Sequence, residues 1–162
     1  MTVGAKPFAD LNAADLMSRD VVAIPERMSL RTAARLLARA QVSGAPVIDQ
    51  DGACVGVISA SDFLRWARGD TPSRRRRHAE SPCVCADWQM VETENLPAEE
   101  VGAYMTADVV TAAPSTGIVE LARMMMDAHI HRILVLDNRR RPVGVLTTTD
   151  ILAAVANAEH ER

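Results

Sequence analysis

Apolar and polar residues alternate along the first half of the chain in runs that are typical of short strands and amphipathic helices. Three strands are predicted, at Val21–Ile24, Ala45–Ile48 and Val55–Ser59. A helix is predicted between the first two strands, and one of its faces carries Leu30, Ala33, Ala34, Leu37 and Gln41. A second helix is expected from about Ser61. The predicted order of elements is therefore strand, helix, strand, strand, helix.

The same pattern returns in the second half of the chain. Residues 17–62 align with residues 105–150 without a gap, with identities such as Met17/Met105, Val47/Val135, Gly56/Gly144 and Asp62/Asp150. The matching strands are Val109–Ala112, Ile133–Leu136 and Val143–Thr147, and the matching helix face carries Ile118, Leu121, Ala122, Met125 and His129. A gapless internal match of this length indicates a duplicated unit. We expect repeat 1 at 10–67, a linker at 68–99 and repeat 2 at 100–158.

Two copies of this unit predict an α/β (α+β) protein. A unit of about 50 residues is only marginally stable alone, because so short a chain buries too little of its apolar surface. We therefore expect the two repeats to pack through their sheets with pseudo-two-fold symmetry.

The composition argues against several classes of protein. The chain has 162 residues, of which 48% are hydrophobic and 3% aromatic, and its formal net charge is -3. A dedicated nucleic-acid binder usually carries a basic excess, and a membrane span needs about 18 apolar residues in a row, so neither partner is expected. Residues 1–11 do not resemble a signal peptide. Because the cysteines are few and odd in number (Cys54, Cys83 and Cys85), we expect a reducing, cytoplasmic location.

Two short motifs resemble a known family. Gly56-Val57-Ile58-Ser59-Ala60-Ser61-Asp62 and Gly144-Val145-Leu146-Thr147-Thr148-Thr149-Asp150 look like the Gly-x-x-Ser/Thr-x-x-Asp signature of cystathionine β-synthase (CBS) domains. Three further stretches fit the same pattern: Asp15-Leu16-Met17-Ser18, Ala103-Tyr104-Met105-Thr106 and Ala45-Pro46-Val47-Ile48-Asp49. The chain is thus similar to a tandem CBS pair, or Bateman module, of the stand-alone bacterial type.

The resemblance implies a sensor rather than an enzyme, with no required cofactor. Such a module is expected to bind an adenosine-containing ligand in the cleft between its repeats. AMP is the first candidate, and ADP, ATP, NAD and S-adenosylmethionine are the others. A homodimer that signals to a separate, unidentified protein partner is also expected. No nucleophile–base pair stands outside the ligand motif, which agrees with a chain that is not an enzyme.

The signature residues have a chemistry that suits a nucleotide. Asp62 and Asp150 stand just inside the last helix of each repeat, where a carboxylate can accept hydrogen bonds from two ribose hydroxyls. Hydroxyl groups at the same two turns, on Ser59, Ser61, Thr147 and Thr149, lie where a helix N-terminus favours phosphate. The simpler alternative is that these residues only cap the helices. Their occurrence in both repeats favours the binding function.

Repeat 2 carries His131-Arg132, and in related CBS domains a His-Arg pair at this place contacts ligand phosphate. Arginine suits that task because it is planar and permanently charged. Repeat 1 has Ser43-Gly44 instead, so the two clefts differ. The ribose could bind at Asp62 or at Asp150, and the sequence leaves both open. The family places adenine against backbone and small side chains, which here are Val22, Ala23, Ala45, Pro46, Val110, Thr111, Ile133 and Leu134.

The linker has two unusual features. Arg74–Arg77 form a basic run that is typical of a solvated loop and could also contact an anion or a partner. Cys83 and Cys85 could share one side of an extended segment. The alternative function is therefore a metal- or redox-responsive protein that uses these cysteines with histidines such as His78.

Overall fold

The computed structural model describes residues 6–67, 96 and 98–158. The chain divides into two compact units. Unit 1 comprises Met1–Val21 together with Val110–Arg162, and unit 2 comprises Val22–Val109. The predicted linker features, Arg74–Arg77, Cys83 and Cys85, lie outside the described residues.

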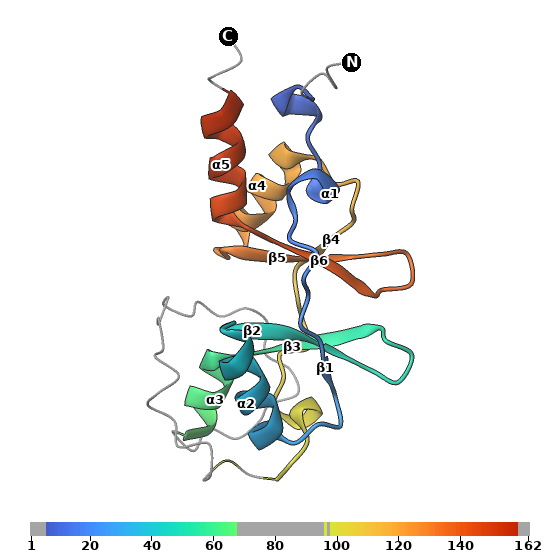
Figure 1. The fold of residues 1–162 in the computed structure, drawn as a ribbon, viewed down its shortest axis with the longest axis vertical. Coiled ribbons are helices and arrows are strands. Elements are labelled where there is room, and N and C mark those ends of the chain that lie inside the picture. The colour runs from blue at the N-terminus through green and yellow to red at the C-terminus, as the bar shows by residue number, and fades with distance from the viewer. Residues whose placement is uncertain (1–5, 68–95, 97, 159–162) are drawn as a thin grey trace. The chain divides into compact units, whose positions relative to one another are not determined.

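Unit 2 contains the first three-stranded sheet, in the order β1-β2-β3. Its strands are β1 (Ile24–Pro25), β2 (Gly44–Ile48) and β3 (Cys54–Ser59), and its helices are α2 (Leu30–Ala40), α3 (Ala60–Ala67) and the 3-10 helix η4 (Val101–Ala103). The strand β2 is parallel to β1 and antiparallel to β3. Figure 1 shows α2 and α3 on one face of this sheet, where the core of the unit forms.

Unit 1 repeats this arrangement with the sheet order β4-β5-β6. Its strands are β4 (Thr111–Ala112), β5 (Arg132–Leu136) and β6 (Pro142–Thr147), and its helices are α1 (Ala13–Leu16), α4 (Ile118–Asp127), α5 (Thr148–Ala158) and the 3-10 helix η1 (Phe8–Asp10). The pairing is again parallel for β4 with β5 and antiparallel for β5 with β6. The predicted α/β class and the predicted order of elements are confirmed in both units.

The helices form where the sequence pattern placed them, because their apolar residues lie on one face. Leu30, Ala33, Ala34 and Leu37 of α2 are buried, as are Ile118, Leu121 and Met125 of α4. The prediction that Gln41 and His129 belong to these helix faces is wrong, because α2 ends at Ala40 and α4 at Asp127. Both residues are exposed and have positive φ angles, of 55° and 51°. They end their helices in the left-handed conformation, which reverses the chain toward the next strand.

The first strand of each repeat is shorter than predicted. The sequence indicates strands at Val21–Ile24 and Val109–Ala112, whereas β1 begins at Ile24 and β4 at Thr111. In this parallel register β1 pairs only with Val47 and Ile48, although β2 begins at Gly44, so Val21–Ala23 leave the sheet before they can pair. The segments before β1 and β4 instead lead from one unit to the other.

Each unit contains the leading segment of the other sequence repeat: residues 10–21 of repeat 1 belong to unit 1, and residues 100–109 of repeat 2 belong to unit 2. In unit 1, Ser18 forms an isolated bridge with Val145 of β6, with two backbone hydrogen bonds of 2.9 Å. In unit 2, Thr106 forms the equivalent bridge with Val57 of β3, also with two bonds of 2.9 Å. The compact units therefore differ from the predicted repeats in their leading segments, and the repeat boundaries remain a prediction.

Candidate functional site

In unit 1, the end of the β5–β6 hairpin brings several of the predicted site residues together. Arg132, the first residue of β5, is the register partner of Thr147, the last residue of β6. The amide of Thr148, which begins α5, donates a hydrogen bond of 3.0 Å to the carbonyl of His131. His131 and Arg132 are both exposed. A cationic side chain, a helix N-terminus and Asp150 thus lie at one corner of the unit.

The carboxylate of Asp150 caps the start of α5 with one of its two oxygens. Asp150 Oδ2 accepts hydrogen bonds from the amide of Thr147, at 2.6 Å, and from Thr147 Oγ1, at 2.7 Å. The amide of Asp150 donates back to Thr147 Oγ1 at 3.3 Å. This reciprocal pair is a capping box, so Asp150 has the capping role that the sequence suggested, and this role uses only its Oδ2. Asp150 is half-buried, and its Oδ1 has no hydrogen-bond partner among the described residues.

The matching carboxylate in unit 2, Asp62, is more fully engaged. Its Oδ2 accepts from the amide of Ser59, at 2.7 Å, and from Ser59 Oγ, at 3.0 Å. Its Oδ1 accepts from Thr106 Oγ1 at 3.2 Å and forms an ion pair with Arg65. Asp62 is also the only charged side chain in the described core, with 3% of its surface exposed.

A count of lone pairs separates the two carboxylates. A carboxylate offers about four acceptor positions. At Asp62, four donor groups take them: the amide and hydroxyl of Ser59, the hydroxyl of Thr106 and the guanidinium of Arg65. At Asp150, the two donors both come from Thr147 and both reach Oδ2. Among the described residues, Asp150 Oδ1 therefore keeps open acceptor positions, whereas both oxygens of Asp62 are occupied.

The other predicted site residues lie in several environments. The side chains of Ala45, Pro46, Ile133 and Leu134 are buried in their strands, so each can offer a ligand little beyond its backbone. Half-buried positions are Val22, Ala23, Gly44, Ser59, Ser61, Val110, Thr111 and Thr147, and exposed positions are Ser43 and Thr149. A Cβ atom at Gly44 would lie 3.0 Å from the carbonyl oxygen of Ile58 and 3.1 Å from Ser59 Cβ. Gly44 is therefore needed for close packing of the hairpin itself.

Two residues at Asp62 were missed in the sequence. Arg65 lies three positions after Asp62 on α3, and opposite charges at that spacing are neighbours on a helix, so the ion pair could have been predicted. Thr106 lies far away in the sequence and reaches Asp62 only because its segment bridges to β3. No sequence signal indicated that contact.

The described residues hold no group of three or more histidine, cysteine or acidic side chains that could bind a metal ion. Cys83, Cys85 and His78, on which the metal or redox alternative depends, fall in the part of the chain that is not described. No helix within residues 6–67 and 98–158 is long and apolar enough to span a membrane.

Comparison with known proteins places this geometry in a family context. An uncharacterized protein from Methanocaldococcus jannaschii is 29% identical over 151 residues, which cover 87% of this chain and 89% of that protein. Other relatives are longer. The chain spans 43% of a second uncharacterized protein from the same organism and 23% of a homoserine O-acetyltransferase from Methanococcoides burtonii.

Solved structures share the fold. The crystal structure of CBSX2 in complex with AMP, a protein of Arabidopsis thaliana, matches with a TM-score of 0.68 and 23% identity over 91% of this chain and 98% of that one. The CBS domain pair of protein MJ0100, in complex with 5'-methylthioadenosine and S-adenosyl-L-methionine, matches with a TM-score of 0.66 and 21% identity. The matched region covers 91% of this chain and 97% of that one.

The family model for the CBS domain matches twice, at residues 13–69 and at residues 100–157. These two matches cover most of the chain and include both Ser/Thr-x-x-Asp turns. The resemblance drawn from the sequence motifs is thereby confirmed, and the chain belongs to the CBS domain family as a tandem pair.

Proposed function

We propose that this chain is a non-catalytic regulatory module that binds an adenine nucleotide. AMP is the first candidate ligand, followed by ADP, ATP, NAD and S-adenosylmethionine. The proposal is supported by family membership and by two structures of the same fold, one in complex with AMP and one with 5'-methylthioadenosine and S-adenosyl-L-methionine. No cofactor is required for this function.

The observation that carries the proposal is Asp150 Oδ1, which lies near the start of β5 and accepts no hydrogen bond from any residue that the structure describes. A carboxylate oxygen with two open lone pairs matches the two neighbouring hydroxyls of a ribose. Arg132 is the register partner of Thr147, which binds Asp150, so one end of a hairpin presents both a diol acceptor and a cation. A permanently charged guanidinium with several donors suits phosphate. We therefore assign the ribose to Asp150 and the phosphate to Arg132 with His131.

The other residues predicted from the sequence form the rest of the proposed site. The base is expected to contact the backbone near Val110, Thr111 and Ile133, since β4 and β5 are adjacent strands of unit 1. Thr149 is exposed in the first turn of α5 and can add a hydroxyl to the phosphate contacts. The equivalent predicted residues of unit 2 are Val22, Ala23, Ser43, Gly44, Ala45, Pro46, Ser59, Ser61 and Asp62.

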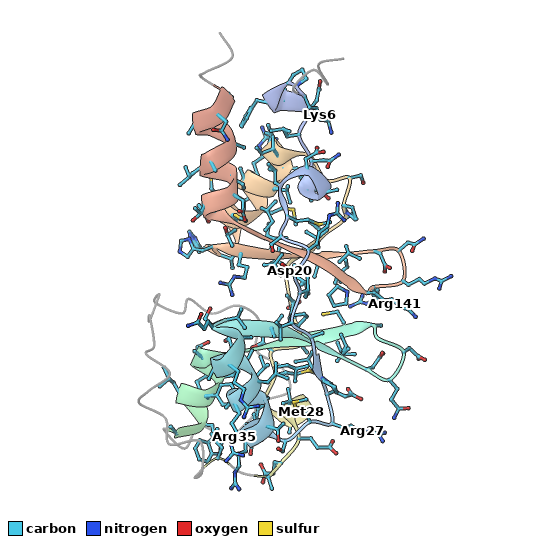
Figure 2. All side chains as sticks on the ribbon, in the orientation of Figure 1. Lys6, Asp20, Arg27, Met28, Arg35 and Arg141 are labelled. Atoms are coloured by element: carbon cyan, nitrogen blue, oxygen red, sulfur yellow. The ribbon has the colours of Figure 1, made fainter. Side chains whose placement is uncertain are left out.

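The module is proposed to act in the cytoplasm as a homodimer that signals to a separate protein. Unit 1 exposes four large apolar side chains on two helices that contact each other, namely Val119, Met126, Leu152 and Val155. The matching positions of unit 2 hold Arg31, Ala38, Leu64 and Ala67, and the same helix α2 carries the exposed Arg35, labelled in Figure 2. An apolar surface is best covered by another apolar surface, so we expect the unit 1 helices of two copies to pair.

Isothermal titration of the protein with each of the five candidate ligands tests the proposal. We expect binding of AMP, and an Asp150→Ala variant should weaken it at least about tenfold, since a hydrogen bond to a charged group contributes about 1.5–3 kcal/mol. The matched control is Asp127→Ala, which removes an exposed carboxylate at the end of α4 and should leave affinity unchanged. Absence of binding to all five ligands at millimolar concentration would overturn the proposal.

A further inference from the structure

Asp62 is the counterpart of Asp150, yet its surroundings are chemically different. We propose that Arg65 and Thr106 act as built-in occupants of the Asp62 carboxylate, which excludes ribose there and limits each chain to a single nucleotide, at Asp150. This inference rests on the proposed function and adds a rule of occupancy to it.

A ribose would have to compete for Asp62 Oδ1. Thr106 Oγ1 donates to this oxygen at 3.2 Å, and the Arg65 guanidinium pairs with the same atom. Because Ser59 already takes Oδ2 twice, a ribose diol could bind only by displacing Arg65 and Thr106. A neutral hydroxyl is a weaker partner for a carboxylate than a guanidinium is, so the exchange is unfavourable.

Burial of the Asp62 carboxylate raises the energy needed to displace Arg65. The side chain of Asp62 is 1% exposed, whereas that of Arg65 is 36% exposed. Removal of the guanidinium from a buried carboxylate would leave a charge with less compensation, and this adds to the energy that a ligand must supply. Asp150 is half-buried and has no cationic partner within the described residues, so none of their cations competes with a ligand for its Oδ1.

The matched positions of repeat 2 lack the two groups that occupy Asp62. The residue that corresponds to Arg65 in repeat 2 is Ala153, which has neither charge nor donor in its side chain. The residue that corresponds to Thr106 is Ser18, which bridges to β6 but makes no hydrogen bond to Asp150 among the described residues. Both occupants of Asp62 are thus specific to unit 2.

The position of Thr106 is fixed by its backbone hydrogen bonds and does not depend on the side-chain rotamer alone. Its amide and carbonyl both bond to Val57 at 2.9 Å, which fixes its Cα beside β3 and directs the hydroxyl toward the start of α3. Arg65 belongs to the same helix as Asp62, one turn later. The two occupants therefore approach the carboxylate from two different segments of unit 2.

The experiment measures the stoichiometry of AMP binding by isothermal titration in matched variants. The wild type should bind about one AMP per chain, and Arg65→Ala combined with Thr106→Val should bind about two, because the lone pairs of Asp62 Oδ1 become available. Arg65→Lys should keep the wild-type stoichiometry because it keeps a cation. Arg35→Ala, which removes an exposed arginine from α2, is the control for loss of charge.

A second set of variants tests exclusion of AMP from Asp62 in a background where the Asp150 site is removed. Asp150→Ala should abolish AMP binding at the concentrations used. Adding Arg65→Ala and Thr106→Val to the Asp150→Ala variant should restore AMP binding, now at Asp62. A further Asp62→Ala substitution should remove the restored binding. Thermal unfolding of each variant confirms that it folds. If Arg65→Ala unfolds the protein, Arg65→Met keeps the aliphatic part of the side chain and replaces it in both sets.

The outcomes distinguish the two proposals. Two AMP molecules on the wild type, or equal loss of affinity from Asp62→Ala and Asp150→Ala, would overturn the exclusion at Asp62 while leaving nucleotide binding intact. A folded Arg65→Ala/Thr106→Val variant that still binds one AMP would do the same. If the wild type binds no AMP, the proposed function fails. In that case binding gained by the variant would support exclusion, and continued absence of binding would overturn it too.

Discussion

Met17 lies directly against Gly144 in unit 1, so closely that no side chain fits at position 144. A Cβ atom there would lie 2.6 Å from Met17 Cγ and 2.9 Å from Met17 Cβ. The same relationship exists in unit 2, where a Cβ at Gly56 would lie 2.7 Å from the carbonyl oxygen of Thr106 and 2.8 Å from Met105 Sδ. These contacts fasten the leading segment of each unit onto its hairpin.

The first prediction concerns this contact. Gly144→Ala should lower the free energy of unfolding by about 1–3 kcal/mol, because the added methyl group overpacks a tight site. Chemical denaturation monitored by circular dichroism measures the change. In a Met17→Ala background the same substitution should cost less, since the atoms that obstruct the methyl group are gone.

Gly102→Ala provides the matched control for that prediction. A Cβ at Gly102 would lie 3.4 Å from the carbonyl oxygen of Glu26, which is an ordinary contact. Its unfolding free energy should stay within about 0.5 kcal/mol of the wild type, as for substitutions away from packed features. Equal losses at Gly144 and Gly102 would contradict the role of the Met17 contact.

The second prediction separates phosphate from ribose. Arg132→Ala should weaken AMP at least about tenfold, because a charge-assisted hydrogen bond is lost, and should change adenosine affinity little. Titration calorimetry with both ligands measures the ratio. Arg123→Ala, an exposed arginine of α4, is the control and should affect neither ligand. A similar loss for adenosine and AMP would show that Arg132 does not serve the phosphate.

The third prediction concerns the apolar helices of unit 1. Met126 has 72% of its surface exposed, the largest fraction among the exposed large hydrophobic side chains described. Met126→Glu would bury a charge in the expected homodimer interface and should shift the dimer toward monomer by at least about tenfold in dissociation constant. Sedimentation velocity measures the shift. Arg35→Glu on α2 should leave the dimer intact, and an unchanged Met126→Glu dimer would place the interface elsewhere.

The fourth prediction concerns Tyr104, the only tyrosine of the chain. Its hydroxyl donates a hydrogen bond to Glu99, which together with burial raises the pKa of Tyr104 to about 12 from the ordinary value of 10.0. A raised pKa means that the interaction stabilises the fold fully below about pH 10 and is lost as the pH rises through 12.

Ultraviolet titration of the phenolate reports this pKa directly because no other tyrosine contributes. Glu99→Gln should lower the pKa toward 10.0, since the negative charge that opposes the phenolate is removed. An unchanged titration curve in Glu99→Gln would show that burial rather than Glu99 sets the value.

Much of each unit could be predicted because its elements have strong local patterns. The hairpin strands Ala45–Ile48 and Ile133–Leu136 are continuous apolar runs, and the helix faces of α2 and α4 repeat at helical spacing. The first strand could not be placed in the same way. Val21–Ala23 has the same apolar character as Ile24 but does not pair, although β2 begins at Gly44, and the apolar pattern does not show where the chain leaves the sheet.

The exchange of leading segments could not be predicted for a different reason. Met17 and Met105 are equivalent in sequence, and so are Gly56 and Gly144. A pairing of Met17 with Gly56 and a pairing of Met17 with Gly144 therefore have the same pattern. Only the three-dimensional structure selects the second pairing.

The sequence motifs identified the candidate residues of the site but not which carboxylate is open to a ligand. Asp62 and Asp150 were both candidates for the ribose because their local motifs are nearly identical. The difference between them comes from Thr106, which is distant in sequence, and from Arg65, whose charge is conspicuous only when its partner is known. Long-range neighbours of this kind are what a motif cannot contain.

The division of the chain has a consequence for the order in which it can fold on the ribosome. Unit 2 is one continuous stretch, Val22–Val109, whereas unit 1 begins before it and ends after it. During synthesis, unit 2 is therefore complete before Gly144 has been made. The segment that contains Met17 leaves the exit tunnel at a time when the β5–β6 hairpin that it binds does not yet exist. We expect unit 2 to fold first and unit 1 to close only when β6 emerges, so that a nascent chain arrested before β6 would protect Leu37 but not Met17 from labelling or proteolysis.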